Sequence, residues 1–101
     1  MKNYTPIPVK HTTYLVPSEE IKTEINFGNE TQFGKGVCGC LILNMGGSTV
    51  TIDGHIVLQQ FDSIRIGVDF PFVDKSTYRF QFTDVAVPAD RQCVLMYYHI
   101  E

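Results

Sequence analysis

The amino-acid sequence predicts an all-β protein, an antiparallel β-sandwich or jelly roll of about seven to nine short strands. Apolar and polar residues alternate over much of the chain with the two-residue period of half-buried strands. Turn-forming residues interrupt this alternation at intervals of roughly 8 to 12 residues. Aromatic residues, which favour sheets, are frequent, with 7 Phe and 5 Tyr among 101 residues. The length predicts one domain.

Charge and hydropathy limit the classes of function. The net charge is −3 and the basic residues are spread singly, whereas nucleic-acid binding usually requires a clustered basic face. No apolar run approaches the roughly 18 residues of a membrane span, and residues 1–16 lack the continuous apolar region of a secretory signal. We therefore expect a soluble protein that binds neither nucleic acid nor membranes.

Residues 49–68 contain the clearest strand pattern, and the rest of the fold is expected to form around them. Alternation over residues 50–58 breaks at Asp53-Gly54, a pair that tolerates the positive φ angles of a type I′ hairpin turn. It breaks again at residues 59–62, and a further alternating run begins at Ile64. This pattern predicts a three-stranded antiparallel meander.

Residues 1–18 are predicted to form an extended N-terminal arm, followed by the β-sandwich domain at residues 19–101. Pro6, Pro8 and Pro17 remove backbone donors and favour extended geometry. Residues 12–16 form a short strand candidate. Because the arm has more apolar residues than a disordered tail usually has, we expect it to lie on its own sheet or on a neighbouring subunit.

Two further segments are predicted to form strands. Residues 19–27 open like a helix N-terminus, but their later alternation favours a strand. Residues 77–83 form an amphipathic strand with Tyr78, Phe80 and Phe82 facing inward.

The strands predicted at residues 37–45 and 93–100 are apolar on both faces. The outer face of an antiparallel sandwich normally meets water and is polar, so something must cover these strands. The arm and a second subunit are both candidates, and we expect a homo-oligomer. The outer face of this sheet would carry Cys38, Cys40 and Ile42, or the alternate residues of that strand, beside Leu95 and Tyr97. The expected contact residues lie in the arm and on this outer face: Tyr4, Ile7, Val9, Tyr14, Val16, Cys40, Ile42, Leu95 and Tyr97.

No catalytic, metal or cofactor site is predicted. Cys38, Cys40 and Cys93 are expected to be free thiols that behave as small buried hydrophobes. The 3 histidines lack the His-x-His spacing of a cupin, which makes a cupin-like metalloenzyme the least favoured alternative. The aspartates sit at strand ends and turns, where Asp is expected for turn chemistry.

A second hypothesis is a small carbohydrate-binding or receptor-binding module. Its contacts would come from the loop at residues 69–75, with Phe70 and Phe72, and from the glycine-rich loop at residues 28–36, with Asn29 and Lys35. Exposed aromatics in such loops would indicate an interaction site.

Part of the chain resembles small virion proteins of tailed bacteriophages, such as capsid decoration proteins, head-fibre bases and tail-associated β-sandwich modules. The matching residues are Asn44, Gly46, Gly47, Ser48, Val50, Thr51, Ile52, Asp53, Gly54, Val57, Leu58, Asp62, Ser63, Ile64 and Ile66. Gln60-Phe61 stands where the family usually has Pro-Gly.

The resemblance implies a non-enzymatic structural protein, made in the host cytoplasm and located in the virion. It also implies a symmetric oligomer whose extended arm lies on a neighbour, with capsid or tail subunits as partners.

Overall fold

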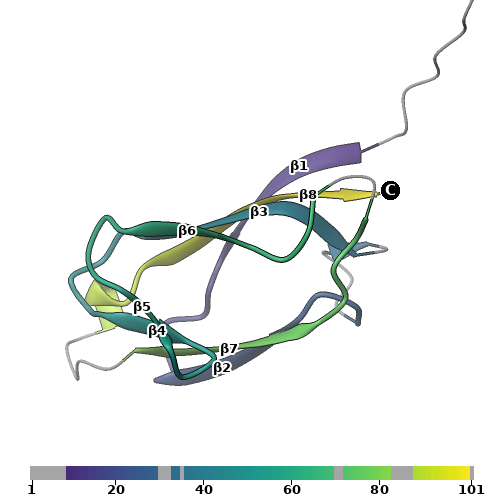
Figure 1. Cartoon of the computed structure of the whole chain (residues 1–101). Coiled ribbons are helices and arrows are strands. Elements are labelled where there is room, and N and C mark those ends of the chain that lie inside the picture. The colour runs from purple at the N-terminus through teal and green to yellow at the C-terminus, as the bar shows by residue number, and fades with distance from the viewer. Residues whose placement is uncertain (1–8, 30–32, 35, 70–71, 83–87, 101) are drawn as a thin grey trace, which may run out of the picture.

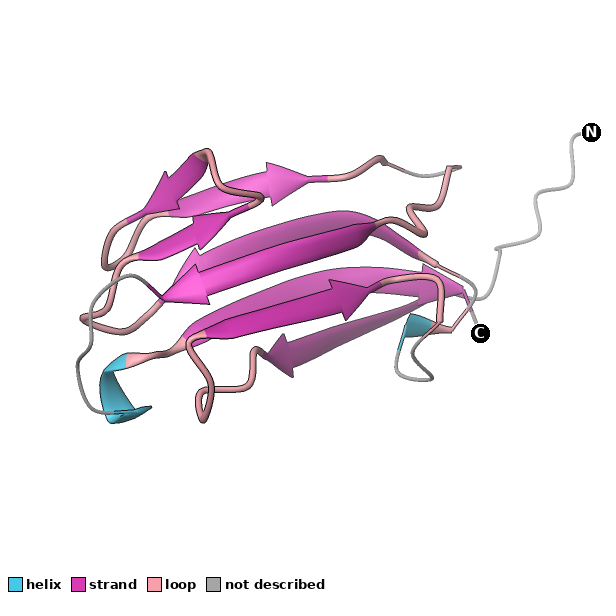
Figure 2. Ribbon diagram, turned by 90° about the horizontal axis from the view of Figure 1, so that it is seen from below, coloured by secondary structure: helices cyan, strands magenta, loops and turns pink. Residues whose placement is uncertain are grey.

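The computed structural model describes residues 9–29, 33–34, 36–69, 72–82 and 88–100, and it confirms the predicted all-β class. Eight strands form two antiparallel four-stranded sheets that pack face to face as a sandwich (Figure 1). The strands of both sheets run roughly along one direction (Figure 2), as in aligned sandwiches.

Each sheet takes strands from both halves of the chain. Sheet A has the order β1 (Val9–Leu15), β8 (Cys93–Ile100), β3 (Val37–Asn44) and β6 (Ser63–Ile66). Sheet B has the order β2 (Lys22–Asn26), β7 (Thr77–Phe82), β4 (Val50–Ile52) and β5 (Ile56–Leu58). A short 3-10 helix, η2 (Pro88–Asp90), precedes β8.

Within residues 49–68, the hairpin at Asp53-Gly54 forms as predicted, but the three-stranded meander does not. Asp53 and Gly54 have φ angles of 54° and 78°, the positive values that a type I′ turn requires between β4 and β5. The next strand, β6, leaves sheet B and pairs with β3 in sheet A. Backbone hydrogen bonds explain the crossing, because Phe61 N–H donates to the Asn44 carbonyl and Asn44 N–H donates to the Asp62 carbonyl.

Part of the predicted arm belongs to the sandwich. Strand β1 pairs antiparallel with β8 of the same chain, and Val16, which follows it, is fully buried in the core. Residues 9–16 therefore lie on their own sheet, the first of the two expected alternatives, and the sandwich begins before residue 19. The predicted contacts at Tyr4 and Ile7 lie outside the described residues.

The core fills the space between the two sheets and corrects several predicted contacts. Tyr14 is partly buried against this core, with its ring 5.5 Å from that of Phe33. Phe80 and Phe82 face inward as predicted. The fully or almost fully buried core residues include four that were expected on the outer face of the sheet: Cys40, Ile42, Leu95 and Tyr97.

One buried polar side chain holds the end of β3 in place. Asn44 is inaccessible to solvent, and its amide nitrogen donates hydrogen bonds of 2.9 Å to the carbonyls of Ser48 and Leu58. Its side-chain oxygen accepts a hydrogen bond from Gly46 N–H. Gly46 has no room for a side chain, because a Cβ atom there would lie 2.1 Å from the Asp90 carbonyl oxygen. This network joins β3, the following turn and β5.

Candidate subunit-binding surface

A β-bulge at Gly39 decides which side chains of β3 face outward. Gly39 has a φ angle of 60°, and the pairing between β3 and β8 shifts register between Cys38 and Leu41. One extra residue in a strand reverses the facing of every residue beyond it. Cys40 and Ile42 therefore face the core together with Val37. Their predicted outward placement was wrong for this reason, and a glycine inside a strand is the sequence feature that indicates a bulge.

The outer face of sheet A is apolar along β3 and β8, and Leu15 extends it onto β1, where the other outward residues are His11 and Thr13. Leu15 of β1 lies opposite Val94 of β8, and Val94 lies opposite Leu43 of β3. In the next row, Met96 lies opposite Leu41. These residues alternate with buried ones and so project away from the core. We call the following set the apolar face: Leu15, Leu41, Leu43, Val94, Met96 and Tyr98.

Exposure is greatest at the margins of the apolar face. Leu15 is 55% exposed and Tyr98 is 45% exposed, while the residues between them are partly buried by their neighbours. Two further large apolar side chains are exposed where β3 ends, Met45 at 45% and Phe61 at 67%. A run of apolar side chains across adjacent strands is typical of a protein-binding surface.

Few polar groups border this face. Arg65 of β6 lies opposite Leu41 and forms an exposed ion pair with Asp69 at 3.6 Å. The ring of His11 packs against Tyr98 with 4.7 Å between ring centroids. The polar groups thus lie on the flanking strands, and the strip along β8 and β3 stays apolar.

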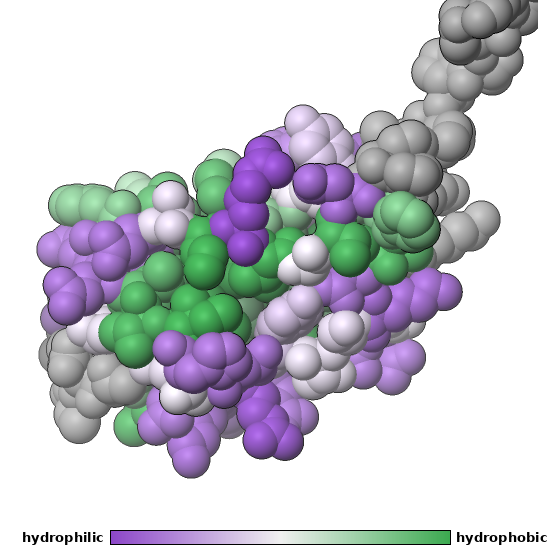
Figure 3. Space-filling view, in the orientation of Figure 1, coloured by the Kyte–Doolittle hydropathy of each residue, from purple (hydrophilic) through white to green (hydrophobic). Residues whose placement is uncertain are grey.

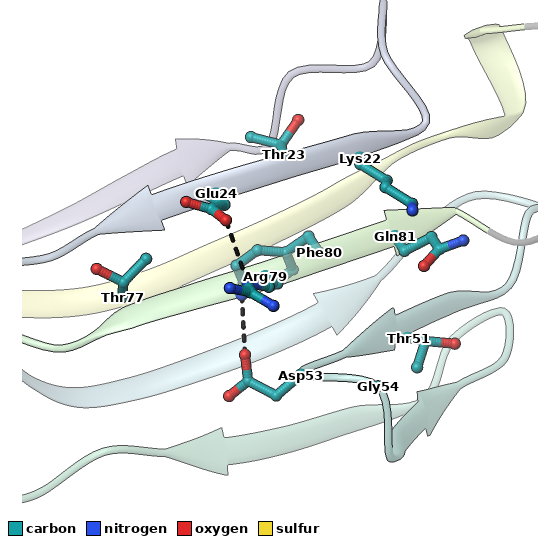
Figure 4. Close-up of a pocket in the computed structure, with 10 residues that line it drawn as sticks. All are labelled: Lys22, Thr23, Glu24, Thr51, Asp53, Gly54, Thr77, Arg79, Phe80 and Gln81. Carbon is teal, nitrogen blue, oxygen red and sulfur yellow. Dashed lines mark hydrogen bonds and ion pairs between the residues drawn. The ribbon is translucent and has the colours of Figure 1, made fainter.

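The outer face of sheet B is mostly polar, with Val57 of β5, which is 56% exposed, as an apolar exception. It forms an open concavity of about 960 Å³ (Figure 4), lined by Lys22, Thr23, Glu24, Thr51, Asp53, Gly54, Thr77, Arg79, Phe80 and Gln81. Arg79 organises it, because its Nε donates to Glu24 at 3.1 Å and its backbone N–H donates to Asp53 at 2.9 Å. The aromatic member of this lining, Phe80, is 1% exposed and so offers no ring on which a sugar could stack.

The sandwich has a second apolar area along the side where β5 and β6 lie. Ile56 of β5 and Ile64 and Ile66 of β6 face inward but are only partly buried against the core. Figure 3 shows hydrophobic surface in the middle of this side, between the two sheets. The core is therefore less well covered here than in the centre of the sandwich.

The thiols are unsuited to nucleophilic chemistry. All three cysteines are buried and free, and burial raises the pKa of Cys40 and that of Cys93 to about 12. Burial also raises the pKa of Cys38, and the nearby Asp69 adds to this. Because the thiolate is the reactive form, the raised pKa values make these thiols less reactive near neutral pH than exposed thiols. Among the described residues, no group of three or more His, Cys, Asp or Glu side chains is placed to hold a metal ion.

Burial of a phenol accounts for a further shift. Tyr78 is partly buried, and this desolvation raises the pKa of its hydroxyl. The same hydroxyl donates a hydrogen bond to the carboxylate of Asp74, which favours the neutral phenol as well. The backbone of Asp74 also forms hydrogen bonds with that of Val37. Asp74 therefore connects the segment before β7 to β3.

The two loops of the ligand-binding hypothesis meet at one end of the sandwich. Phe27 N–H bonds to the Ser76 carbonyl, and Gly36 lies against Val73. Phe72 is 70% exposed, and Asn29 is also exposed. The other two proposed contacts, Phe70 and Lys35, lie outside the described residues.

Comparisons with protein-family models, curated proteins and solved structures give no match. Within the described ranges, no helix has the length and apolar character needed to cross a membrane.

Proposed function

We propose that this chain is a non-enzymatic structural subunit that binds neighbouring subunits through the apolar face of sheet A. The contrast between the two outer faces of one sandwich supports this proposal most strongly. Apart from Val57, sheet B presents charged and polar side chains, as a solvated antiparallel sheet does, whereas the apolar face presents leucine, valine, methionine and tyrosine. Binding then removes this apolar area from water.

The assembly we propose is the virion of a tailed bacteriophage. The sequence motif around the hairpin of β4 and β5 supports this assignment through its resemblance to small virion proteins. In the structure, residues of that motif form two turns of the backbone. Asn44 and Gly46 shape the first turn, and Asp53 and Gly54 shape the second. The partners are then copies of this chain and capsid or tail subunits.

Sedimentation of two matched double variants tests the proposal. Leu43→Lys with Met96→Lys places two charges on the apolar face, and Thr51→Lys with Gln81→Lys places two charges on the outer face of sheet B. We expect the first pair to weaken self-association at least tenfold, about 1.4 kcal/mol, and the second to leave it unchanged. Equal effects of the two pairs, or no effect of the first, would count against the apolar face as the binding surface. Far-UV circular dichroism shows whether each variant is folded.

A further inference from the structure

Among the described residues, strand β1 forms one edge of sheet A. Within the described residues it pairs only with β8, and it is the longest of the edge strands, with 7 residues against 5 in β2, 4 in β6 and 3 in β5. Proteins usually protect a long edge strand with proline, a bulge or charged side chains, because its unpaired backbone groups can bind another strand.

One hydrogen bond shows which backbone N–H and C=O groups of β1 point away from β8. Val16 N–H donates to the Cys93 carbonyl at 2.9 Å, so this position bonds to β8. In an antiparallel pair, hydrogen-bonded positions alternate with positions whose N–H and C=O groups point the other way. The groups that point away from β8 therefore belong to Val9, His11, Thr13 and Leu15. None of these is proline, so the whole edge can donate and accept.

We infer that β1 pairs antiparallel with β1 of a second copy of this chain, about a two-fold axis at Thr12. This register places His11 opposite Thr13 of the second copy, and Val9 opposite Leu15. Every outward-pointing residue thus meets another outward-pointing residue, so all the free edge groups are satisfied together.

Side-chain chemistry favours this register. Thr12 then meets Thr12 of the second copy, and cross-strand threonine pairs are stabilising. Lys10 meets Tyr14 rather than another lysine. A two-fold pairing of β2 about Glu24, in contrast, would place two carboxylates opposite each other, which is destabilising.

Pairing through β1 also extends the proposed function, on which this consequence depends. Leu15 of β1 belongs to the apolar face, so the two copies would place their apolar faces side by side on one continuous sheet. The partner at the edge is a second copy of the chain, while the partner on the face is a further subunit. The dimer then offers two apolar areas on one side of the sheet, separated by His11 and Thr13 of the two β1 strands.

A proline at position 13 tests the edge contact without disturbing the fold. Thr13→Pro removes an N–H that points away from β8, and proline is tolerated on edge strands. Thr13→Val keeps the N–H and serves as the control. Native mass spectrometry is carried out with Leu43→Lys and Met96→Lys present throughout, because these charges weaken association through the apolar face. In this background we expect a dimer with Thr13 or with Thr13→Val, and a monomer with Thr13→Pro whose far-UV circular dichroism spectrum is unchanged. A monomer with Thr13 in place, or a dimer with Thr13→Pro, would overturn the inference.

Cross-linking tests the register. Cα atoms directly opposite at a non-hydrogen-bonded position lie about 4.5 Å apart, within disulfide range, so Thr12→Cys should form a covalent dimer on oxidation. His11→Cys should not, because its counterpart lies on the diagonal at about 7 to 8 Å. Cross-linking through position 11 and not 12 would contradict this pairing. If Thr13→Pro dissociates the dimer but the charged apolar-face variant has no effect, the edge contact stands and the proposed function fails; the reverse result removes the edge contact and keeps the proposed function.

Discussion

Gly39 lies against the ring of Tyr98, close enough that a Cβ atom on Gly39 would be 3.3 Å from Cδ2 of Tyr98. The positive φ of Gly39 and this contact belong to the same bulge, which sets the facing of β3. The composition of the apolar face therefore depends on one glycine in the middle of a strand.

Replacing this glycine should destabilise the fold. We expect Gly39→Ala to lower the free energy of unfolding by about 1 to 2 kcal/mol, because a left-handed backbone conformation is unfavourable for L-residues with a Cβ atom. Gly47→Ala is the control, since the nearest atom to a Cβ there is 3.9 Å away, and should change stability by less than about 0.5 kcal/mol. Urea denaturation measures both. A Gly39→Ala variant as stable as the wild type would show that the bulge does not need glycine.

Asn44 should be among the residues most sensitive to substitution. Asn44→Ala removes three hydrogen bonds and leaves the carbonyls of Ser48 and Leu58 without this donor in a buried site. We expect a loss of at least about 2 kcal/mol in the free energy of unfolding. The exposed Asn29→Ala serves as the control, with an expected change within about 0.5 kcal/mol. Thermal unfolding followed by circular dichroism measures both variants. Equal melting temperatures would show that the hydrogen bonds of Asn44 do not stabilise the fold.

The turn between β5 and β6 contains a correctable strain. Phe61 has a φ angle of 68°, although a bulky side chain disfavours this conformation, and it is 67% exposed. Phe61→Asn should raise the free energy of unfolding by about 0.5 to 1 kcal/mol, since Asn tolerates positive φ well and little burial is lost. Phe61→Val, which is also disfavoured at positive φ, should give no gain. Chemical denaturation decides, and a loss of stability in Phe61→Asn would mean that the ring packs usefully in the monomer.

Alkaline pH should destabilise the protein through its buried thiols. The pKa values of Cys40 and Cys93 are about 12 in the folded chain and near 9.0 when the thiols are exposed. The unfolded chain therefore loses these protons first. The contribution of the two thiols to the free energy of unfolding is fully present below pH 9.0 and is lost as the pH rises toward 12. Each thiol contributes a slope of about 1.4 kcal/mol per pH unit in this range, and the raised pKa of Tyr78 acts in the same direction.

Denaturation under reducing conditions across this alkaline range measures that slope. Cys93→Ala should reduce the slope by the contribution of one thiol, whatever its effect on absolute stability. A slope that is the same in the variant and the wild type would place the thiolate of Cys93 in a more solvated site than the structure indicates.

Local sequence patterns predicted the elements of this fold better than their arrangement. The Asp53-Gly54 turn and the inward-facing Phe80 and Phe82 follow from local rules of turn geometry and alternation, and the structure contains them. The placement of β6 could not be predicted in the same way. It depends on backbone hydrogen bonds between Asn44 and residues 61–62, which bring together segments that are distant along the chain.

The sequence identified the two strands that are apolar on both faces, but not which of their side chains face outward. The apolar character of β3 and β8 on both faces is visible in the sequence and is retained in the structure. Counting alternate residues through Gly39 placed Cys40 and Ile42 outward, because a bulge changes the count by one. The residues that do face outward, such as Leu41 and Leu43, are the neighbours of Cys40 and Ile42 along the strand.

Covalent footprinting with a photoactivated carbene, at low and at high protein concentration, tests the central claim most directly. If the apolar face of sheet A is the subunit-binding surface, labelling of Leu43, Met96 and Tyr98 should fall as the protein assembles. Labelling of Arg79 and Gln81 on the outer face of sheet B should stay constant. Unchanged labelling of the apolar face on assembly, or protection of sheet B in its place, would contradict the account.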